Sequence, residues 1–101
     1  MFDPKKIMEM MKDAYQMQQQ MQDELRHKKV EGSSGGGMVT VMMNGQFEIE
    51  QIKIDPSLTQ MNDIHFLEDM VRAAVNDATK NARNVMGEQM KSLTNKLGIS
   101  L

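Results

Sequence analysis

The first quarter of the chain shows the spacing of apolar side chains that is typical of an α-helix. No glycine or proline occurs between Lys5 and Glu31, and apolar residues recur three or four positions apart, which places them on one helical face. These residues are Ile7, Met10, Met11, Ala14, Tyr15, Met17, Met21 and Leu25. Asp3 is a favourable N-cap, and Pro4 suits the first helical position. We therefore predict a helix over residues 4–28.

The middle of the chain, residues 29–55, has the composition of strands and turns. The Asn44-Gly45 pair is flanked by β-forming residues and predicts a hairpin with a two-residue type I′ turn. A glycine-rich stretch precedes this hairpin and predicts a flexible loop. We expect a three-stranded antiparallel sheet, with an edge strand over 29–31, a loop over 32–37, a strand over 38–43 and a return strand over 46–54.

The return strand changes phase, because Phe47 and Ile49 occupy odd positions whereas Ile52 and Ile54 occupy even ones. A β-bulge near Glu50-Gln51 brings all four side chains to one face. A three-residue turn would shift the strand pairing. The two-residue turn implies the cross-strand pairs Met42–Phe47 and Thr40–Ile49 and puts Val39, Val41 and Met43 on the opposite face.

The last part of the chain again has helical periodicity. Asp55-Pro56-Ser57 is expected to cap a short helical turn, and Asn62 or Asp63 to cap a long helix over 63–97. Such a helix is about 50 Å long, whereas a compact domain of this size is only about 34 Å across. We therefore predict a homodimer in which a second chain covers the distal part of the apolar stripe. The expected interface residues are Val85, Met86, Met90, Leu93 and Leu97.

Length and composition limit the possible protein classes. The chain has 101 residues, a formal net charge of −2 and no cysteine, which suits one domain over 1–101 without disulfides or thiolate metal sites. No apolar run is long enough to span a membrane. The N-terminal MFDPKK lacks the apolar segment of a signal peptide. We expect a cytoplasmic protein with no membrane partner.

The sequence contains no recognisable catalytic or metal-binding arrangement. His27 and His65 lie in different helices without a neighbouring ligand, and no serine lies in a G-x-S-x-G motif. The glycine-rich loop lacks the lysine and the following helix of a phosphate-binding P-loop, although its N–H groups could touch a phosphate backbone. The methionines fit a core and a dimer interface, or an adaptable surface for a partner. We predict no enzyme, cofactor, metal or small-molecule substrate.

Basic side chains gather on parts of both predicted helices despite the acidic net charge. On the last helix, an arc of about 100° faces away from the apolar stripe and contains Arg72, Asn76, Lys80, Arg83 and Lys91. Such groups are also typical of ordinary solvated helix faces and of helix C-termini. The candidate DNA-binding residues are Lys5, Lys6, Lys12, Arg26, Lys28, Lys29, Arg72, Lys80, Arg83 and Lys91.

The ordered set of segments resembles the YbaB/EbfC family of nucleoid-associated proteins. The segments that carry this resemblance are Met17–Gln22, Val30–Val41, Asn44-Gly45, Ile52–Leu58, Leu67–Val71 and Ala73–Ala78. The resemblance implies an α+β subunit of the order α-β-β-β-α and a homodimer with protruding helices. It also implies duplex DNA binding through the helices at the bacterial nucleoid, with weak or broad sequence preference.

The sequence therefore supports two functional hypotheses. The first is a nucleoid-associated homodimer that contacts DNA phosphates through Lys and Arg side chains. The alternative is a protein-interaction adaptor whose Met-lined groove binds a partner helix. The salt dependence of binding distinguishes the two hypotheses, because phosphate binding weakens steeply as the salt concentration rises whereas binding in an apolar groove does not.

Overall fold

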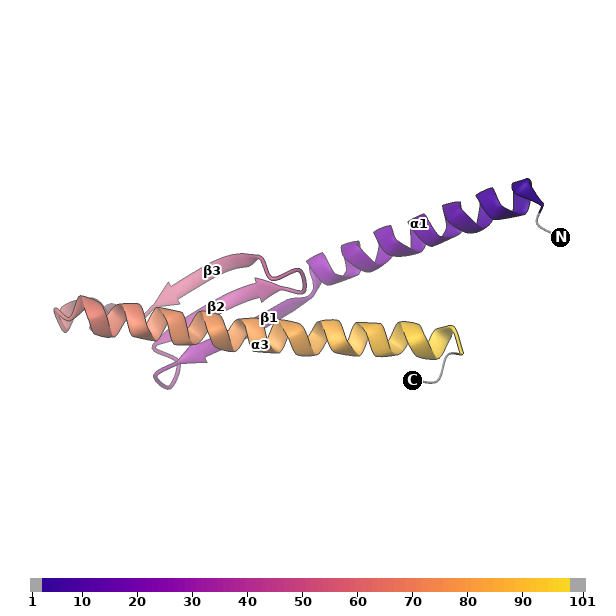
Figure 1. Cartoon of the computed structure of the whole chain (residues 1–101). Helices are drawn as coiled ribbons and strands as arrows, with labels where there is room; N and C mark the ends of the chain where they lie inside the picture. Colours follow the sequence, from indigo (N-terminus) through magenta and orange to yellow (C-terminus); the bar gives the residue numbers. More distant parts are fainter. Residues whose placement is uncertain (1–2, 99–101) are drawn as a thin grey trace.

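Two long helices flank a small antiparallel sheet in the computed structural model, which describes residues 3–98 (Figure 1). The three strands pair in the order β1-β2-β3, so the predicted α-β-β-β-α layout is confirmed. The elements are α1 (Pro4–His27), β1 (Lys29–Ser34), β2 (Val39–Asn44), β3 (Ile49–Ile54), α2 (Pro56–Gln60) and α3 (Ile64–Lys96).

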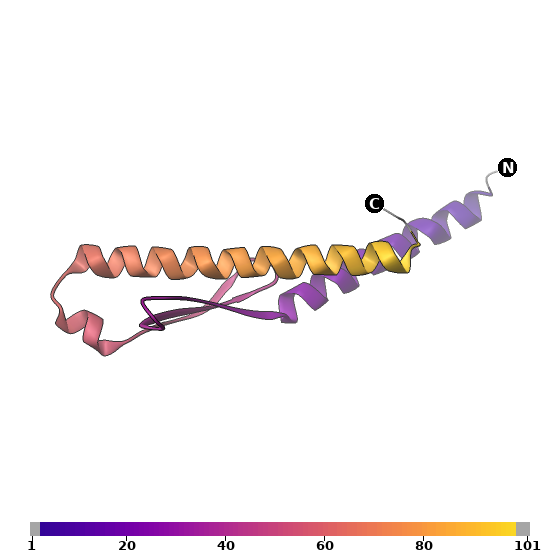
Figure 2. The same cartoon turned by 90° about the horizontal axis from the view of Figure 1, so that it is seen from below.

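The two long helices make the subunit strongly elongated. α3 runs along one face of the sheet and continues past it, and α1 leaves the same end of the sheet at an angle to α3 (Figures 1 and 2). The subunit measures 71 × 24 × 17 Å with a radius of gyration of 19.8 Å, against about 13 Å for a compact chain of this length. The expectation that the last helix outruns a compact domain is therefore confirmed.

Each helix begins at an aspartate that accepts a backbone hydrogen bond. Asp3 accepts from the Lys5 N–H at 3.1 Å, Asp55 from the Ser57 N–H at 2.9 Å, and Asp63 from the Phe66 N–H at 3.1 Å. The Ser57 N–H also lowers the pKa of the Asp55 carboxyl, because it stabilises the charged form. Of the two candidate caps for α3, Asp63 is the one used.

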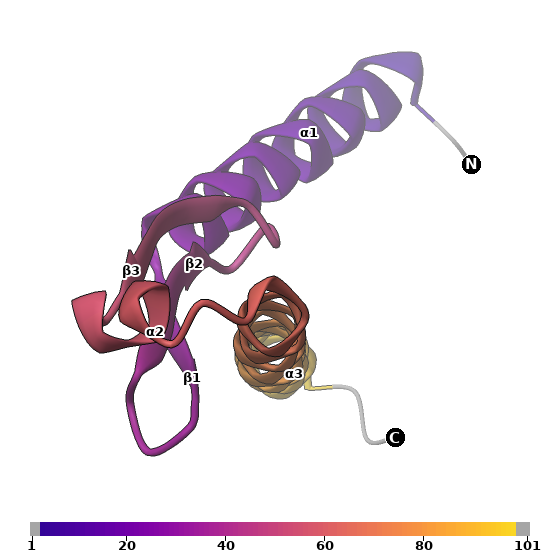
Figure 3. The ribbon, with the colours of Figure 1, turned by 90° about the vertical axis from the view of Figure 1, so that its left-hand side faces the viewer.

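The core lies where α3 rests on β1 and β2 (Figure 3). Val39, Val41 and Met43 of β2 are buried beneath α3. On β1, Gly32 lies against the backbone of α3, and a Cβ there would overlap the Ala78 nitrogen and the Ala74 carbonyl oxygen. The absence of a side chain at Gly32 therefore allows α3 to approach the strand backbone closely.

Side-chain hydrogen bonds tie the same strand to one flank of α3. The Ser33 N–H donates to Asp77 Oδ2 at 2.9 Å, and Asn81 Nδ2 donates to the Glu31 carbonyl at 2.7 Å. These contacts explain why β1 extends to Ser34 and not only to Glu31 as the sequence predicted. The glycine-rich loop is correspondingly shorter than expected and covers residues 35–38.

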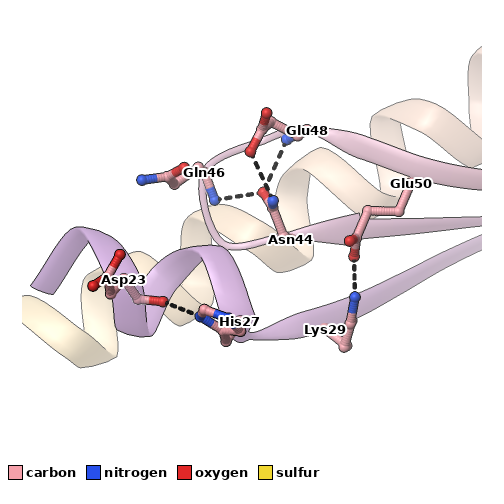
Figure 4. Close-up of polar contacts among 7 residues, drawn as sticks. All are labelled: Asp23, His27, Lys29, Asn44, Gln46, Glu48 and Glu50. Atoms are coloured by element: carbon pink, nitrogen blue, oxygen red, sulfur yellow. Dashed lines mark hydrogen bonds and ion pairs between the residues drawn. The ribbon is translucent and has the colours of Figure 1, made fainter. Parts of the chain in front are cut away.

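The hairpin at Asn44 forms as predicted, but the predicted turn type is wrong. Positive φ occurs at Phe47 (66°) and not at Asn44 or Gly45, which is the pattern of a three-residue loop. The Asn44 side chain holds this loop by accepting hydrogen bonds from the Gln46 and Glu48 N–H groups (Figure 4). Gly45 serves a different purpose, since its N–H donates to the Leu25 carbonyl at 2.7 Å and a Cβ would crowd that residue.

The three-residue loop changes the strand pairing and the face that the apolar residues share. The predicted bulge is present, with Glu50 as the extra residue between Ile49 and Gln51. The predicted pairs Met42–Phe47 and Thr40–Ile49 are wrong, and so is the assignment of Val39, Val41 and Met43 to the opposite face. The observed pairs are Met43–Ile49, Val41–Ile52 and Val39–Ile54, and directly opposite residues lie on one face.

Two glycine substitutions should have opposite effects on stability. Gly32→Ala places a methyl group into the backbone of α3 and should lower the free energy of unfolding by about 1–3 kcal/mol or more. Gly87→Ala lies in a helix with open space around it and should raise that free energy by up to about 1 kcal/mol. Urea unfolding of both variants measures the difference. A Gly32→Ala protein as stable as the parent would contradict the close contact of β1 with α3.

Candidate nucleic-acid interface

The predicted cationic arc is exposed on the face of α3 that points away from the sheet. Its residues are separated by about half a turn from the buried Ala74, Ala78 and Ala82 when positions advance by about 100° per residue. All of its members are solvent-exposed: Arg72, Asn76, Lys80, Arg83 and Lys91. The packing of α3 on the sheet therefore leaves this face free for a ligand.

Three of the candidate cations are already engaged by carboxylates of the same chain. Arg26 pairs with Asp23, Arg72 with Asp69 at 3.1 Å, and Lys29 with Glu50 at 2.6 Å (Figure 4). Exposed pairs of this kind contribute little to stability, but a DNA phosphate would have to compete with the carboxylate. These three residues are weaker candidates than the sequence suggested.

Lys80, Arg83 and Lys91 are different, because none of them joins an ion pair within residues 3–98. Lys80 and Arg83 lie next to Asn81 and Ala82, which contact the sheet, and Lys91 lies about 12 Å beyond Arg83 along the helix. Lys5, Lys6 and Lys12 are exposed on the outer half of α1. Since α1 diverges from α3, the structure does not bring these two groups together within one subunit, and Lys28 follows α1 beside the sheet.

Charge is strongly segregated along the chain. Residues 29–79 carry eight acidic and three basic side chains, residues 80–96 carry one acidic and four basic, and residues 3–28 carry five of each. The distal half of α3 is therefore the strongly cationic segment of an otherwise neutral or acidic subunit. Such a local excess attracts a polyanion even when the net charge is negative.

The remaining polar candidates do not form a catalytic or metal-binding arrangement. His27 Nδ1 lies 2.7 Å from the Asp23 carbonyl (Figure 4), and His65 lies 3.7 Å from Glu68 on an exposed turn. Across the described part of the chain, no three His, Asp or Glu side chains converge as metal ligands. The glycine turn lies beside Asp55, whose N–H donates to the Met38 carbonyl at 2.8 Å, so this turn is a poor place for a phosphate.

The structure leaves an apolar surface on β3 that the sequence pattern did not identify as exposed. Ile49, Ile52 and Ile54 share the face of the buried β2 side chains, but α3 packs chiefly over β1 and β2. The three isoleucines therefore remain 38–46% exposed. We call this set the isoleucine face.

The predicted interface residues on α3 have different environments. Val85 packs against the core, and Met86 is half-buried. Leu93 lines a cleft against α1 of its own chain. Met90 and Leu97 are about half exposed, at 50% and 54%, and are therefore the members most available to a second chain.

Comparison with known proteins identifies the family. A model of the YbaB/EbfC DNA-binding family matches residues 3–97. This chain belongs to that family. It is 47% identical over 93 residues to a nucleoid-associated protein of Nitrobacter hamburgensis, covering 89% of this chain and 88% of the relative. It is 44% identical over 96 residues to one from Caldanaerobacter subterraneus subsp. tengcongensis, covering 92% and 86%.

The fold is also found in a solved structure. An uncharacterized protein from Helicobacter pylori superposes with a TM-score of 0.77 at 22% identity, covering 92% of this chain and 98% of that one. The family is a nucleoid-associated DNA-binding family rather than a family of enzymes, in agreement with the prediction from sequence. Within residues 3–98, no helix combines the length and apolar character needed to cross a bilayer.

Proposed function

We propose that this protein binds duplex DNA at the nucleoid as a homodimer, chiefly through the cationic face of distal α3. The observation that carries this proposal is the group of exposed, unpaired cations Lys80, Arg83 and Lys91. Between Lys80 and Lys91 the helix rises about 16 Å, which corresponds to about five base pairs of DNA. Lys and Arg on such a face contact phosphates, and phosphate contacts position a protein without reading sequence. Weak or broad sequence preference follows.

The homodimer is supported by exposed apolar side chains on one side of the subunit. Asp77 and Asn81 hold one flank of α3 against β1, so Val75 lies on the opposite flank, toward β3. Farther along, Met86, Met90 and Leu97 follow this second flank. Together with the isoleucine face, they form a surface that a second copy of the chain can cover.

Charge also favours a second copy as the partner on this surface. The half of α3 near the sheet lies in the acidic segment, and the distal half is basic. If two α3 helices pack antiparallel, the basic half of each lies beside the acidic half of the other. The dimer then presents both cationic faces to DNA, and two-fold symmetry suits a duplex.

A charge placed on the isoleucine face should disrupt the dimer. Ile52→Asp buries a carboxylate without a partner in the proposed interface, which is strongly unfavourable. Gln51→Asp is the matched control, because the neighbouring side chain lies on the opposite face of β3. In sedimentation equilibrium at micromolar concentration, the parent and Gln51→Asp should have the mass of two chains and Ile52→Asp the mass of one. Met90→Asp should weaken the dimer as well.

Circular dichroism of Ile52→Asp shows whether the subunit remains folded. A folded Ile52→Asp protein that still sediments as two chains would rule out this face as the interface.

Reversing the charge of distal α3 should weaken binding to all DNA sequences alike. Each lost phosphate contact removes about 0.9 from the slope of log K against log salt. Lys80→Glu with Arg83→Glu removes up to four contacts per dimer and should flatten that slope by about 3–4. Fluorescence anisotropy on two unrelated duplexes over a salt series measures both effects.

Lys29→Glu with Lys53→Glu is the control, since it changes the net charge equally but lies on the sheet. Should this control lose more binding than the α3 variant, the site lies at the sheet instead. Binding that is insensitive to salt and to both variants would favour the adaptor hypothesis.

A further inference from the structure

A second apolar surface lies on α1, away from the isoleucine face. Leu25 is the one buried residue described for this helix, and Ile7, Met10, Met11 and Met17 are 40–70% exposed. The outer half of α1 extends beyond the sheet and diverges from α3 (Figures 1 and 3). Ile7, Met10, Met11 and Ala14 together form an almost entirely apolar patch. A solvated helix gains nothing from such a patch, which indicates that another helix covers it.

The apolar positions of α1 are arranged symmetrically about Ala14. Ile7 and Met21 lie seven residues on either side of Ala14, and Met11 and Met17 lie three residues on either side. All five fall on one side of the helix at about 100° per residue. Two copies of this helix, packed antiparallel, would therefore match these five apolar residues, with Met10 opposite Gln18. The small side chain at the centre lets the two helices approach closely where they cross.

A cleft near the sheet end of α1 lies where it could receive the Ile7 side chain of an antiparallel second copy. Met17 and Met21 of α1 and Leu93 of α3 line a cleft of about 140 Å³, and Gln89 donates a hydrogen bond to Glu24 across it. Ile7 lies fourteen residues from Met21, or about 21 Å along the helix. Antiparallel pairing centred on Ala14 places Ile7 of each copy at the cleft of the other.

Charge favours the same orientation. Lys6 and Glu24 lie on the same flank of the apolar seam, at opposite ends of α1. In an antiparallel pair, Lys6 of one copy lies near Glu24 of the other, which is an attractive arrangement. In a parallel pair, Lys6 and Glu24 would instead lie about 27 Å apart along the helices and could not meet.

We propose that α1 is a docking surface for α1 of a second copy, packed antiparallel with its two-fold axis at Ala14. This surface is separate from the isoleucine face, so a chain can use both surfaces at once. Two different isologous contacts on one subunit join one dimer to the next. The proposal adds to the DNA-binding homodimer a second, weaker contact, which needs no DNA and is too weak to be populated in sedimentation at micromolar concentration.

Because the parent has no cysteine, single cysteines can test the pairing directly. Ala14→Cys places two thiols at the two-fold axis, within the roughly 7 Å that a disulfide can span. Gln16→Cys, on the opposite side of α1, is the matched control. Under a thiol-specific oxidant and without DNA, Ala14→Cys should form covalent dimers at least about ten-fold faster than Gln16→Cys, because pairing raises the effective thiol concentration.

The orientation is tested with cysteines at the two ends of the seam. Ile7→Cys alone should react no faster than Gln16→Cys, because its two thiols lie about 21 Å apart. A mixture of Ile7→Cys with Met21→Cys should form the mixed covalent dimer rapidly. Fast reaction of Ile7→Cys alone would show parallel pairing and overturn the proposal. Equal rates for Ala14→Cys and Gln16→Cys would show that α1 does not pair with itself.

Combination with Ile52→Asp separates this proposal from the homodimer. Ala14→Cys should still form covalent dimers in the Ile52→Asp background, because the two surfaces are distinct. Loss of this reaction in a folded double variant would overturn the claim of two independent contacts. Failure of the DNA-binding variants to change affinity would leave these cross-linking results unchanged.

Discussion

The backbone contact between Gly32 and α3 determines how the subunit is built. A helix and a sheet are normally separated by side chains from both elements. Here Gly32 of β1 has no side chain, and α3 contributes only the methyl groups of Ala74, Ala78 and Ala82. The hydrogen bonds from Ser33 and Asn81 then hold α3 to the β1 side of the sheet. A single helix held at that side cannot also cover the third strand. The open isoleucine face is thus a consequence of the close contact at Gly32.

The same contact explains why so much of the apolar surface lies outside the core. Only the part of α3 near the alanines is buried, and α1 is attached by Leu25, whose carbonyl accepts the Gly45 N–H. The last turns of α3 and nearly all of α1 extend from this small core (Figure 1). Their apolar stripes cannot be satisfied within one chain. The proposed association would bury part of this surface and so stabilise the folded state.

The elements that sequence predicted well are those controlled by local signals. Asp3, Asp55 and Asp63 cap their helices as expected from residue type, and the bulge at Glu50 follows from the change of phase between Ile49 and Ile52. The predicted turn type at Asn44-Gly45 is wrong, because the prediction relied on the local preference of an Asn-Gly pair for a type I′ turn. In the structure, Gly45 is instead required for the close approach of Leu25, a contact between residues twenty positions apart.

The part of the candidate site that depends on local periodicity was also predictable from the sequence. Helical periodicity alone separates the cationic face of α3 from its apolar stripe, so Lys80, Arg83 and Lys91 could be grouped from sequence. The pairing of Lys29 with Glu50 could not be predicted from the sequence, because it depends on the register of three strands. α3 therefore presents three different surfaces on one helix: a narrow alanine face that packs in the core, an apolar flank proposed to bind a second chain, and a cationic face proposed to bind DNA. Because the core needs only small residues over a few turns, the other two sides can extend along the full length of the helix. An acidic protein can in this way carry a cationic surface that is long enough to follow a duplex.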